Sequence, residues 1–160
     1  HRLGEEEGLK FVTCRFGTIF GASIGMRFHT AVNKFCLQAV LGQPLTVWKT
    51  ALHQNRPYLA LGDAVKAVNF IIDKKLYDGS VYNVVTTNSS VSSIVDIISN
   101  HVADISVQYV DTQIMNQLSY QVSSRHFSDL GFEFKGDLDQ GIGQTIDLLK
   151  GLRAGLGVGR

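Results

Sequence analysis

Arg56 is the residue whose type and setting most clearly suggest chemistry. It lies in the stretch HQNRPYLALGDAVKAV, residues 53–68, directly before Pro57. A residue before proline is biased toward an extended backbone, and a guanidinium held in this way can present its planar fork to an anion, especially a phosphate. The alternative is a surface arginine paired with a loop carboxylate, and the local sequence leaves both interpretations open.

Three more polar side chains could contact a ligand, and each has an ordinary structural alternative. Asn33 stands among apolar residues near the start of a predicted helix, where it could bind a ligand or satisfy the local backbone. Thr18 follows the first predicted strand, at the end where ligands usually approach a parallel sheet, or it only closes a turn. Tyr120 could stack on a ligand, or simply bond to one partner as buried tyrosines often do.

Other reactive residue types give no pattern that predicts catalysis or metal binding. His29, His53, His101 and His126 lie on four different predicted elements, with no Ser or Cys in a nucleophile-type turn beside them, so a hydrolytic triad has no support. The two cysteines, Cys14 and Cys36, lie in apolar stretches without the neighbours of a tetrahedral zinc site. We interpret both as reduced, buried thiols, and Asp137 and Asp139 as helix-start residues.

Composition limits the partners and the compartment. The 160 residues carry a formal net charge of +1, with Lys and Arg scattered along the chain, which gives no reason to expect nucleic acid or an anionic membrane surface. No apolar run approaches the roughly 20 residues that span a bilayer, and HRLGEEEGLK at the start has no apolar signal core. We therefore expect a cytoplasmic protein with one packed unit over residues 1–150 and a flexible, glycine-rich tail over 151–160.

The elements that must position these side chains alternate between strand and helix, which predicts the α/β class. Val32, Phe35, Cys36, Ala39 and Val40 have helical spacing and end at Gly42, a predicted C-terminal cap. Asp63, Ser90 and Asp137 are predicted to begin three further helices, the first with Val65, Val68 and Ile72 on one face. The predicted strands cover residues 9–16, 43–48, 57–61, 79–86 and 105–110. No GxGxxG-like turn leads into a helix, so a dinucleotide loop is not expected in this chain.

The order of the segments resembles the C-terminal half of extended short-chain dehydrogenases, the NAD-dependent epimerase/dehydratase family that acts on nucleotide sugars. The stretches that carry the resemblance are LKFVTCRFGTIFG, NKFCLQAVLGQPLTVW, NRPYLALGDAVKAV, GSVYNVV and YQVSSRHFSDLGF, over residues 9–149. Each motif is loose alone, and the five together in this order are typical of the family. The resemblance implies the last parallel strands of a Rossmann-type sheet together with the small substrate-binding subdomain.

The resemblance also implies a role for individual residues. Gly17 and Ile19 would face the NAD cofactor, and Thr18 takes the place of the family's substrate-binding asparagine. The family's diphosphate-contacting asparagine maps to Asn33, with Lys34 beside it, and its diphosphate-clamping arginine maps to Arg56. The segment along the nucleotide base maps to Thr46, Val47 and Trp48, while Asn116 and Tyr120 match a ribose-binding position and a tyrosine near the C-terminal end.

The family's chemical groups are not in this stretch of sequence. Its glycine-rich cofactor loop and its Tyr-x-x-x-Lys pair precede the strand that begins here near Leu9, and neither occurs in the chain. The resemblance therefore implies a fragment with no catalytic residue of its own, which binds a UDP- or dTDP-linked sugar within a full-length NAD-dependent epimerase or dehydratase. A non-catalytic ligand- or partner-binding module of the same fold is the alternative, and a homodimer formed through exposed sheet edges is also conceivable.

Overall fold

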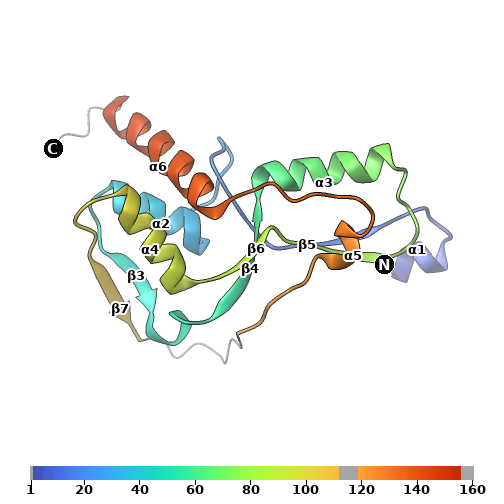
Figure 1. Cartoon of the computed structure of the whole chain (residues 1–160), viewed down its shortest axis with the longest axis horizontal. Helices are drawn as coiled ribbons and strands as arrows, with labels where there is room; N and C mark the ends of the chain where they lie inside the picture. The colour runs from blue at the N-terminus through green and yellow to red at the C-terminus, as the bar shows by residue number, and fades with distance from the viewer. Residues whose placement is uncertain (1, 112–118, 156–160) are drawn as a thin grey trace.

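The computed structural model describes residues 2–111 and 119–155 and confirms the α/β class. Helices and strands alternate along most of the chain, and the strands are short (Figure 1). The helices are α1 (Arg2–Glu6), α2 (Ala31–Val40), α3 (Leu61–Asp73), α4 (Val91–His101), α5 (Arg125–Ser128) and α6 (Leu138–Gly155), with a 3-10 turn at Lys49–Ala51. The strands are β1 (Thr13–Phe16), β2 (Thr18–Phe20), β3 (Leu45–Trp48), β4 (Asn55–Ala60), β5 (Val81–Val84), β6 (Thr87–Ser90) and β7 (Val107–Val110).

The strands pair in three small sheets, in which segments far apart in sequence lie side by side. β1 pairs in parallel with β5, β3 pairs in parallel with β7, and β4 lies between parallel β2 and antiparallel β6. Pro57 is tolerated in β4 because β2 reaches only Tyr58–Ala60. At Pro57, therefore, β4 has a paired strand only on the β6 side, and the missing N–H breaks no ladder on the other.

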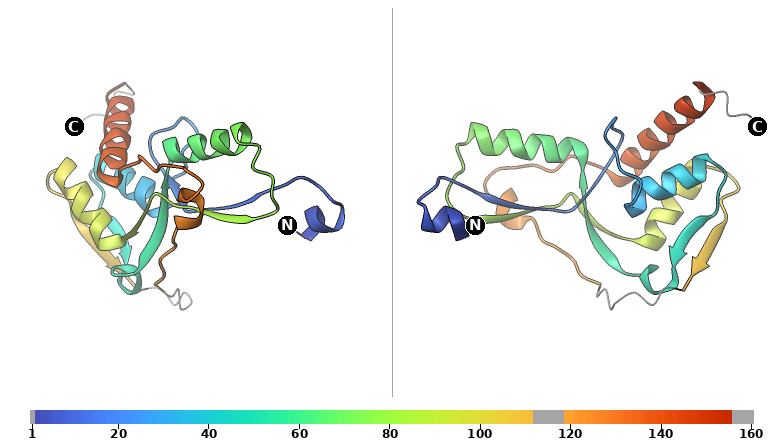
Figure 2. Two further views of the ribbon diagram at one scale, coloured as in Figure 1. Left: turned by 45° about the vertical axis from the view of Figure 1, so that its right-hand side comes forward. Right: turned by 180° about the vertical axis from the view of Figure 1, so that it is seen from behind.

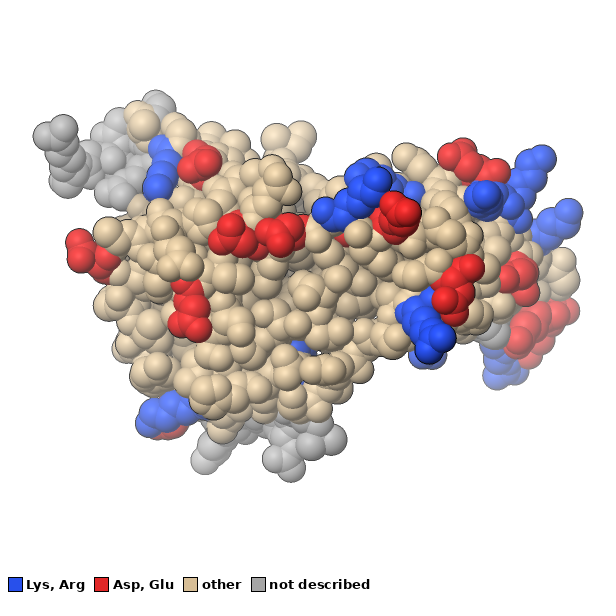
Figure 3. All heavy atoms as spheres, viewed as in Figure 1, with Lys and Arg blue, Asp and Glu red and all other residues tan. Residues whose placement is uncertain are grey.

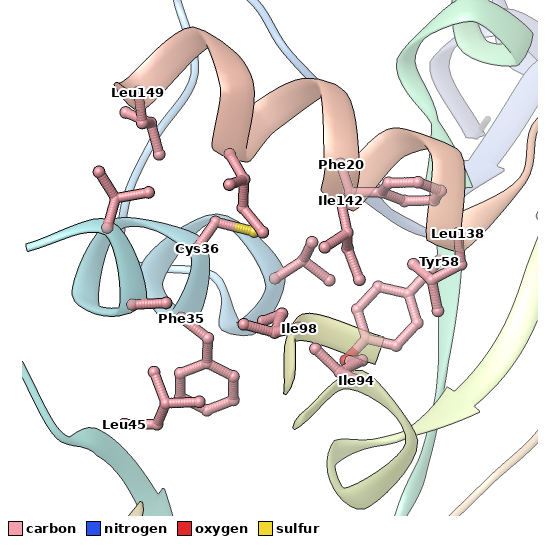
Figure 4. Close-up of a cluster of buried hydrophobic side chains, with 14 of the residues drawn as sticks. Phe20, Phe35, Cys36, Leu45, Tyr58, Ile94, Ile98, Leu138, Ile142 and Leu149 are labelled. Atoms are coloured by element: carbon pink, nitrogen blue, oxygen red, sulfur yellow. The ribbon is translucent and has the colours of Figure 1, made fainter. Parts of the chain in front are cut away.

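Two hydrophobic cores lie on either side of β4, and Figure 2 shows the molecule extended between them, with α1 and α6 at opposite ends. The first, here called the α6 core, joins α2, α4 and α6 and includes Phe35, Ile98 and Ile142. Figure 4 shows the Tyr58 ring entering it from β4. The second, the α3 core, packs α3 against β5 and a group of aromatic rings that includes Phe127 and Phe132. β4 is thus the element that connects both cores.

Most of the local signals read from the sequence are confirmed. Ser90 caps α4, with its hydroxyl accepting from Ser93 N–H at 3.1 Å, and the Asp137 carboxylate accepts from Gln140 N–H at 2.8 Å at the start of α6. Gly42 has a φ of +67°, the left-handed conformation in which glycine ends helices. One expectation is wrong: residues 151–155, expected to belong to a flexible tail, form the end of α6. Residues 156–160 lie outside the described residues.

The prediction that Asp63 is the N-cap of α3 is wrong. The helix begins at Leu61 and its N-cap is Ala60. The Asp63 side chain is only 1% exposed, and its carboxylate accepts hydrogen bonds from Lys135 N–H at 3.0 Å, Gly136 N–H at 2.9 Å and the Thr86 hydroxyl at 2.8 Å. Asp63 therefore joins α3 to the segment that enters α6, a long-range role that local sequence does not reveal.

Two further side-chain expectations need correction. Cys36 is fully buried, but Cys14 is only partly buried, and both are free thiols. Val65, Val68 and Ile72 share one side of α3 as predicted, yet they are exposed, and Ala64, Ala67 and Ile71 form the side that packs on the α3 core.

Within the described part of the chain, the model contains no helix with the length and apolarity needed to cross a bilayer.

Candidate ligand-binding site

Arg56 lines a pocket of about 190 Å³ in which residues from α2, β3 and β4 meet. We call it the Arg56 pocket. Four of the residues expected to bind substrate are brought together here: Lys34, Thr46, Trp48 and Arg56. The other lining residues are His29, Ala31, Phe35, Ala51, Gln54, Tyr58 and Val91.

The Arg56 side chain is held in place by its neighbours. One guanidinium nitrogen, Nη1, donates to Asn55 O at 2.9 Å, and Nη2 donates to Gln54 Oε1 at 2.8 Å. The guanidinium carbon lies 5.1 Å from the centroid of the Tyr120 ring, within the range of a cation–π contact. A guanidinium restrained on several sides loses less conformational freedom when it binds an anion.

The segment that carries Tyr120 is fixed along β4 and β6 by hydrogen bonds. Asn55 N–H donates to Ser119 Oγ at 2.9 Å. The Asn88 side chain forms a two-point contact with Val122, donating to its carbonyl at 3.0 Å and accepting from its N–H at 2.9 Å. A segment more than 60 residues away in sequence from Arg56 is therefore placed beside it.

β3 and α2 form the opposite wall of the Arg56 pocket and are tied together by Gln38. The Gln38 amide donates to Thr46 Oγ1 at 3.2 Å and accepts from Thr46 N–H at 3.3 Å. Trp48 is 39% exposed at the pocket, whereas Val47 is 1% exposed and packs in the α6 core. Since successive side chains of a strand point to opposite faces, only the main chain of Val47 is left for a ligand.

A second pocket, of about 440 Å³, lies between the turn after β2 and the start of α2. We call it the Asn33 pocket. It is lined by Thr18, Ile19, Phe20, Gly21, Ser23, Gly25, Met26, Arg27, His29, Thr30, Asn33 and Leu61. The Asn33 side chain is 4% exposed and donates from Nδ2 to Arg27 O at 3.1 Å. Among the described residues, neither Asn33 Oδ1 nor Thr30 Oγ1 has a hydrogen-bond partner, although both atoms are buried.

Gly17 and Tyr120 line a third pocket, on the other side of β4, together with Arg15, Phe16 and Pro57. A Cβ on Gly17 would lie 3.0–3.1 Å from main-chain atoms of Pro57 and Tyr58. The glycine is thus explained by the close approach of β4, and it gives no independent support for a cofactor contact. Ile19 does fit one, because its apolar side chain is 40% exposed beside the Asn33 pocket. Asn116 lies outside the described residues.

Sequence reasoning did not assign several polar residues of these pockets to a ligand site, among them Arg27, His29 and Gln54. His29 lines both the Arg56 and the Asn33 pockets, and Gln54 both lines the Arg56 pocket and supports Arg56. Burial raises the pKa of the Tyr58 hydroxyl, and the nearby Arg56 charge acts in the opposite direction. Tyr58 is therefore a neutral hydroxyl at ordinary pH. The signal for Gln54 was its place two residues before Arg56, but no local pattern distinguishes His29.

The charge of the two pockets is positive. Lys34 and Arg56 line the first and Arg27 lines the second, and among the residues that the model describes no Asp or Glu lines either. On the face seen in Figure 3, by contrast, acidic and basic side chains are intermixed. Both pockets also adjoin the first turn of α2, where free N–H groups and the helix dipole favour an anion. Within residues 2–111 and 119–155, no cluster of His, Cys, Asp or Glu has the form of a metal site.

Comparison with known proteins gives the class to which this fold and site belong. The model of the NAD-dependent epimerase/dehydratase family matches residues 1–84, more than half of the chain. The chain therefore belongs to the NAD-dependent epimerase/dehydratase family, whose cofactor is NAD. A curated relative, the chloroplastic UDP-sulfoquinovose synthase of Spinacia oleracea, is 38% identical over 74 residues, which cover 45% of this chain and 15% of that protein.

Solved structures share the fold at low sequence identity. The UDP-glucose 4-epimerase of Thermus thermophilus, in complex with NAD, matches with a TM-score of 0.80 and 21% identity, over 94% of this chain and 50% of that one. The UDP-glucuronic acid 4-epimerase of Bacillus cereus, in complex with UDP-glucuronic acid and NAD, matches with a TM-score of 0.84 and 18% identity, over 95% of this chain and 49% of that one. These matches confirm the fold expected from the resemblance. The chain spans about half the length of the structures that it matches.

Proposed function

We propose that residues 1–150 are the C-terminal, substrate-binding part of an NAD-dependent nucleotide-sugar epimerase or dehydratase. Within the full-length enzyme, this part would hold a UDP- or dTDP-linked sugar, while the groups that carry out the chemistry come from elsewhere in the protein. Membership of the family supports the reaction class. The pockets described above support the role of this part.

One observation carries the proposal: two cations, a tryptophan and a threonine from three different elements converge on the Arg56 pocket. Arg56 and Lys34 would neutralise the diphosphate, and Arg56 would do so with its guanidinium already oriented by Gln54 and Tyr120. The exposed Trp48 offers an apolar ring beside which a nucleotide base can lie. The Asn33 pocket, which borders the same turn of α2, would receive the sugar.

NAD, when bound, supplies a hydride acceptor for the sugar. In this chain the residue suited to lie against it is Ile19, whose exposed apolar side chain adjoins the Asn33 pocket. Thr18 lies beside Ile19 on β2 and is paired with Tyr58 of β4, so the cofactor and the sugar would share this strand. The contribution of these residues is to position the sugar, since a short and aligned hydride path depends on that placement.

The test is calorimetric titration of UDP and dTDP into the full-length protein and its Arg56→Ala variant. We expect one nucleotide to bind and Arg56→Ala to cost about 1.5–3 kcal/mol of binding free energy, the range of a charge-assisted hydrogen bond. Arg125→Ala is the matched control, because Arg125 is an exposed arginine of α5 that does not line the Arg56 pocket. Equal nucleotide affinities for the wild type and the Arg56→Ala variant would contradict the assignment of Arg56 to the diphosphate.

A turnover assay distinguishes the proposed enzyme from a non-catalytic binding module of the same fold. The full-length protein with NAD should convert a UDP- or dTDP-sugar, with products resolved by chromatography. Nucleotide-sugar binding without conversion of any member of a panel of such sugars would instead favour a binding module of the same fold.

A further inference from the structure

We propose that the sugar held in the Asn33 pocket carries a carboxylate, so that the preferred substrates are nucleotide-linked hexuronic acids, with Arg27 and His29 as the residues that recognise the acid. This inference rests on the proposed function and makes it more specific. It depends on the continuity of the two pockets, on the unpartnered atoms of the second one, and on the distribution of positive charge between them.

The Arg56 and Asn33 pockets form neighbouring parts of one ligand site. His29 lines both. On the first turn of α2, Lys34 faces one pocket and Asn33 the other. A ligand whose diphosphate lies near Lys34 and Arg56 can therefore extend past His29 into the larger, 440 Å³ pocket. The larger pocket falls within the range of about 300–1,000 Å³ that is typical of small-molecule sites.

The buried atoms of the Asn33 pocket suit a ligand with hydroxyl groups. Asn33 Nδ2 already donates to Arg27 O, which fixes the amide orientation and leaves Oδ1 as a buried acceptor with no partner in the described structure. Thr30 Oγ1, beside it at the start of α2, is also buried and has no hydrogen-bond partner in the described structure. Buried polar atoms are normally hydrogen-bonded, and a sugar hydroxyl can donate to Asn33 Oδ1 and exchange a hydrogen bond with Thr30.

The positive charge exceeds what a diphosphate alone uses. Lys34 and Arg56 lie in the first pocket, and the second adds Arg27, with His29 as a further hydrogen-bonding side chain where the two pockets meet. Arg27 forms no ion pair with any residue in the described ranges, and no acidic residue in those ranges lines its pocket. A neutral sugar would use none of this charge, whereas a carboxylate can accept two parallel hydrogen bonds from a guanidinium.

The experiment compares three ligands on the full-length protein by calorimetric titration: the free nucleotide, its glucose ester and its glucuronate ester, with UDP or dTDP chosen by which one binds. We expect the glucuronate ester to bind on the order of tenfold more tightly than the glucose ester at low salt, and the ratio to fall as salt rises. Arg27→Gln should abolish the preference and leave the affinity for the free nucleotide unchanged. Arg27→Lys should keep part of the preference because the charge remains, and Arg125→Gln should keep all of it.

The possible results separate this inference from the function on which it rests. If neither UDP nor dTDP binds, the proposed function fails, and the acid preference fails with it. If a nucleotide binds but the two esters bind equally well, the function stands and the acid preference is overturned. The preference is also overturned if Arg27→Gln weakens all three ligands alike, because that pattern indicates a structural or a diphosphate-binding role for Arg27.

Discussion

The guanidinium of Arg56 lies 5.1 Å from the ring of Tyr120, a residue from a different segment that is fixed in place by Ser119 and Val122. The ring therefore limits the directions in which the guanidinium can turn, while the Nη atoms are held by Gln54 and by Asn55 O. A guanidinium held in this way is oriented before any ligand arrives, and this pre-orientation can be tested one residue at a time.

Tyr120→Leu should weaken nucleotide binding by about 0.5–1 kcal/mol, the range of an exposed cation–π contact. Tyr120→Phe is the matched control, because it keeps the aromatic face and should bind as the wild type does. Titration of the nucleotide into both variants makes the comparison. If Phe and Leu behave alike, the ring face is not what orients Arg56.

Gly17→Ala should destabilise the protein by about 1–3 kcal/mol, as overpacking typically does, because the new methyl group would lie 3.0–3.1 Å from main-chain atoms of Pro57 and Tyr58. Since β4 must shift to accommodate it, nucleotide affinity should fall as well. Gly62→Ala is the control: a Cβ there meets nothing within 4 Å, and because Gly62 lies in the first turn of α3 the variant should be at least as stable as the wild type. Urea denaturation measures both, and equal stabilities for the two variants would contradict the close-approach explanation.

Asp63→Asn should lower the free energy of unfolding by about 1.5–3 kcal/mol. The amide places an N–H group where the carboxylate accepts from Lys135 and Gly136, so at least one buried donor loses its partner. Asp73→Asn, at the exposed end of the same helix, should change stability little. Chemical denaturation followed by circular dichroism compares them, and an Asp63→Asn variant as stable as Asp73→Asn would show that the link to α6 contributes nothing.

The Cys36 thiol should make the free energy of unfolding decrease as the pH becomes alkaline. Burial raises the pKa of the Cys36 thiol to about 12, from an ordinary value of about 9. The folded state therefore keeps a proton that the unfolded state loses, so the stability contributed below about pH 9 declines as the pH rises from about 9 toward 12. Cys36→Ala lacks this titration, and its stability gap from the wild type should narrow from pH 8 to pH 10. A constant gap in urea titrations across this range would be the contrary result.

Local sequence was sufficient wherever the partners of a residue lie within one helical turn. The Ser90 cap, the Asp137 cap and the Gly42 stop were all predicted, because their hydrogen bonds or backbone angles depend on nearby residues. Asp63 was assigned wrongly for the opposite reason, since its partners lie about 70 residues away. The exposure of Val65 could not be deduced either, because helical spacing predicts a shared face and not what covers it.

For the candidate site, the resemblance supplied what local physics left open. Arg56, Lys34, Thr46 and Trp48 lie in one pocket, but local sequence left Arg56 with an ordinary surface alternative, and the other three were expected there only from the resemblance. Val47 was expected along the nucleotide base together with Trp48, but the two side chains lie on opposite faces of β3, as successive residues of a strand do. His29 and Arg27 escaped notice because the turn after β2 has no period from which side-chain direction can be read.

The packing of α6 on α2 has a consequence for the order of events during synthesis. The residues that line both pockets have all been synthesised once Val91 is added, yet α2, which carries Asn33 and Lys34, is covered by Ile142, Ile146 and Leu149 of α6. Domains fold as units once their parts are available. The nascent chain should therefore remain unable to hold a nucleotide until α6 has emerged, which makes nucleotide binding a measure of the docking of α6 on α2.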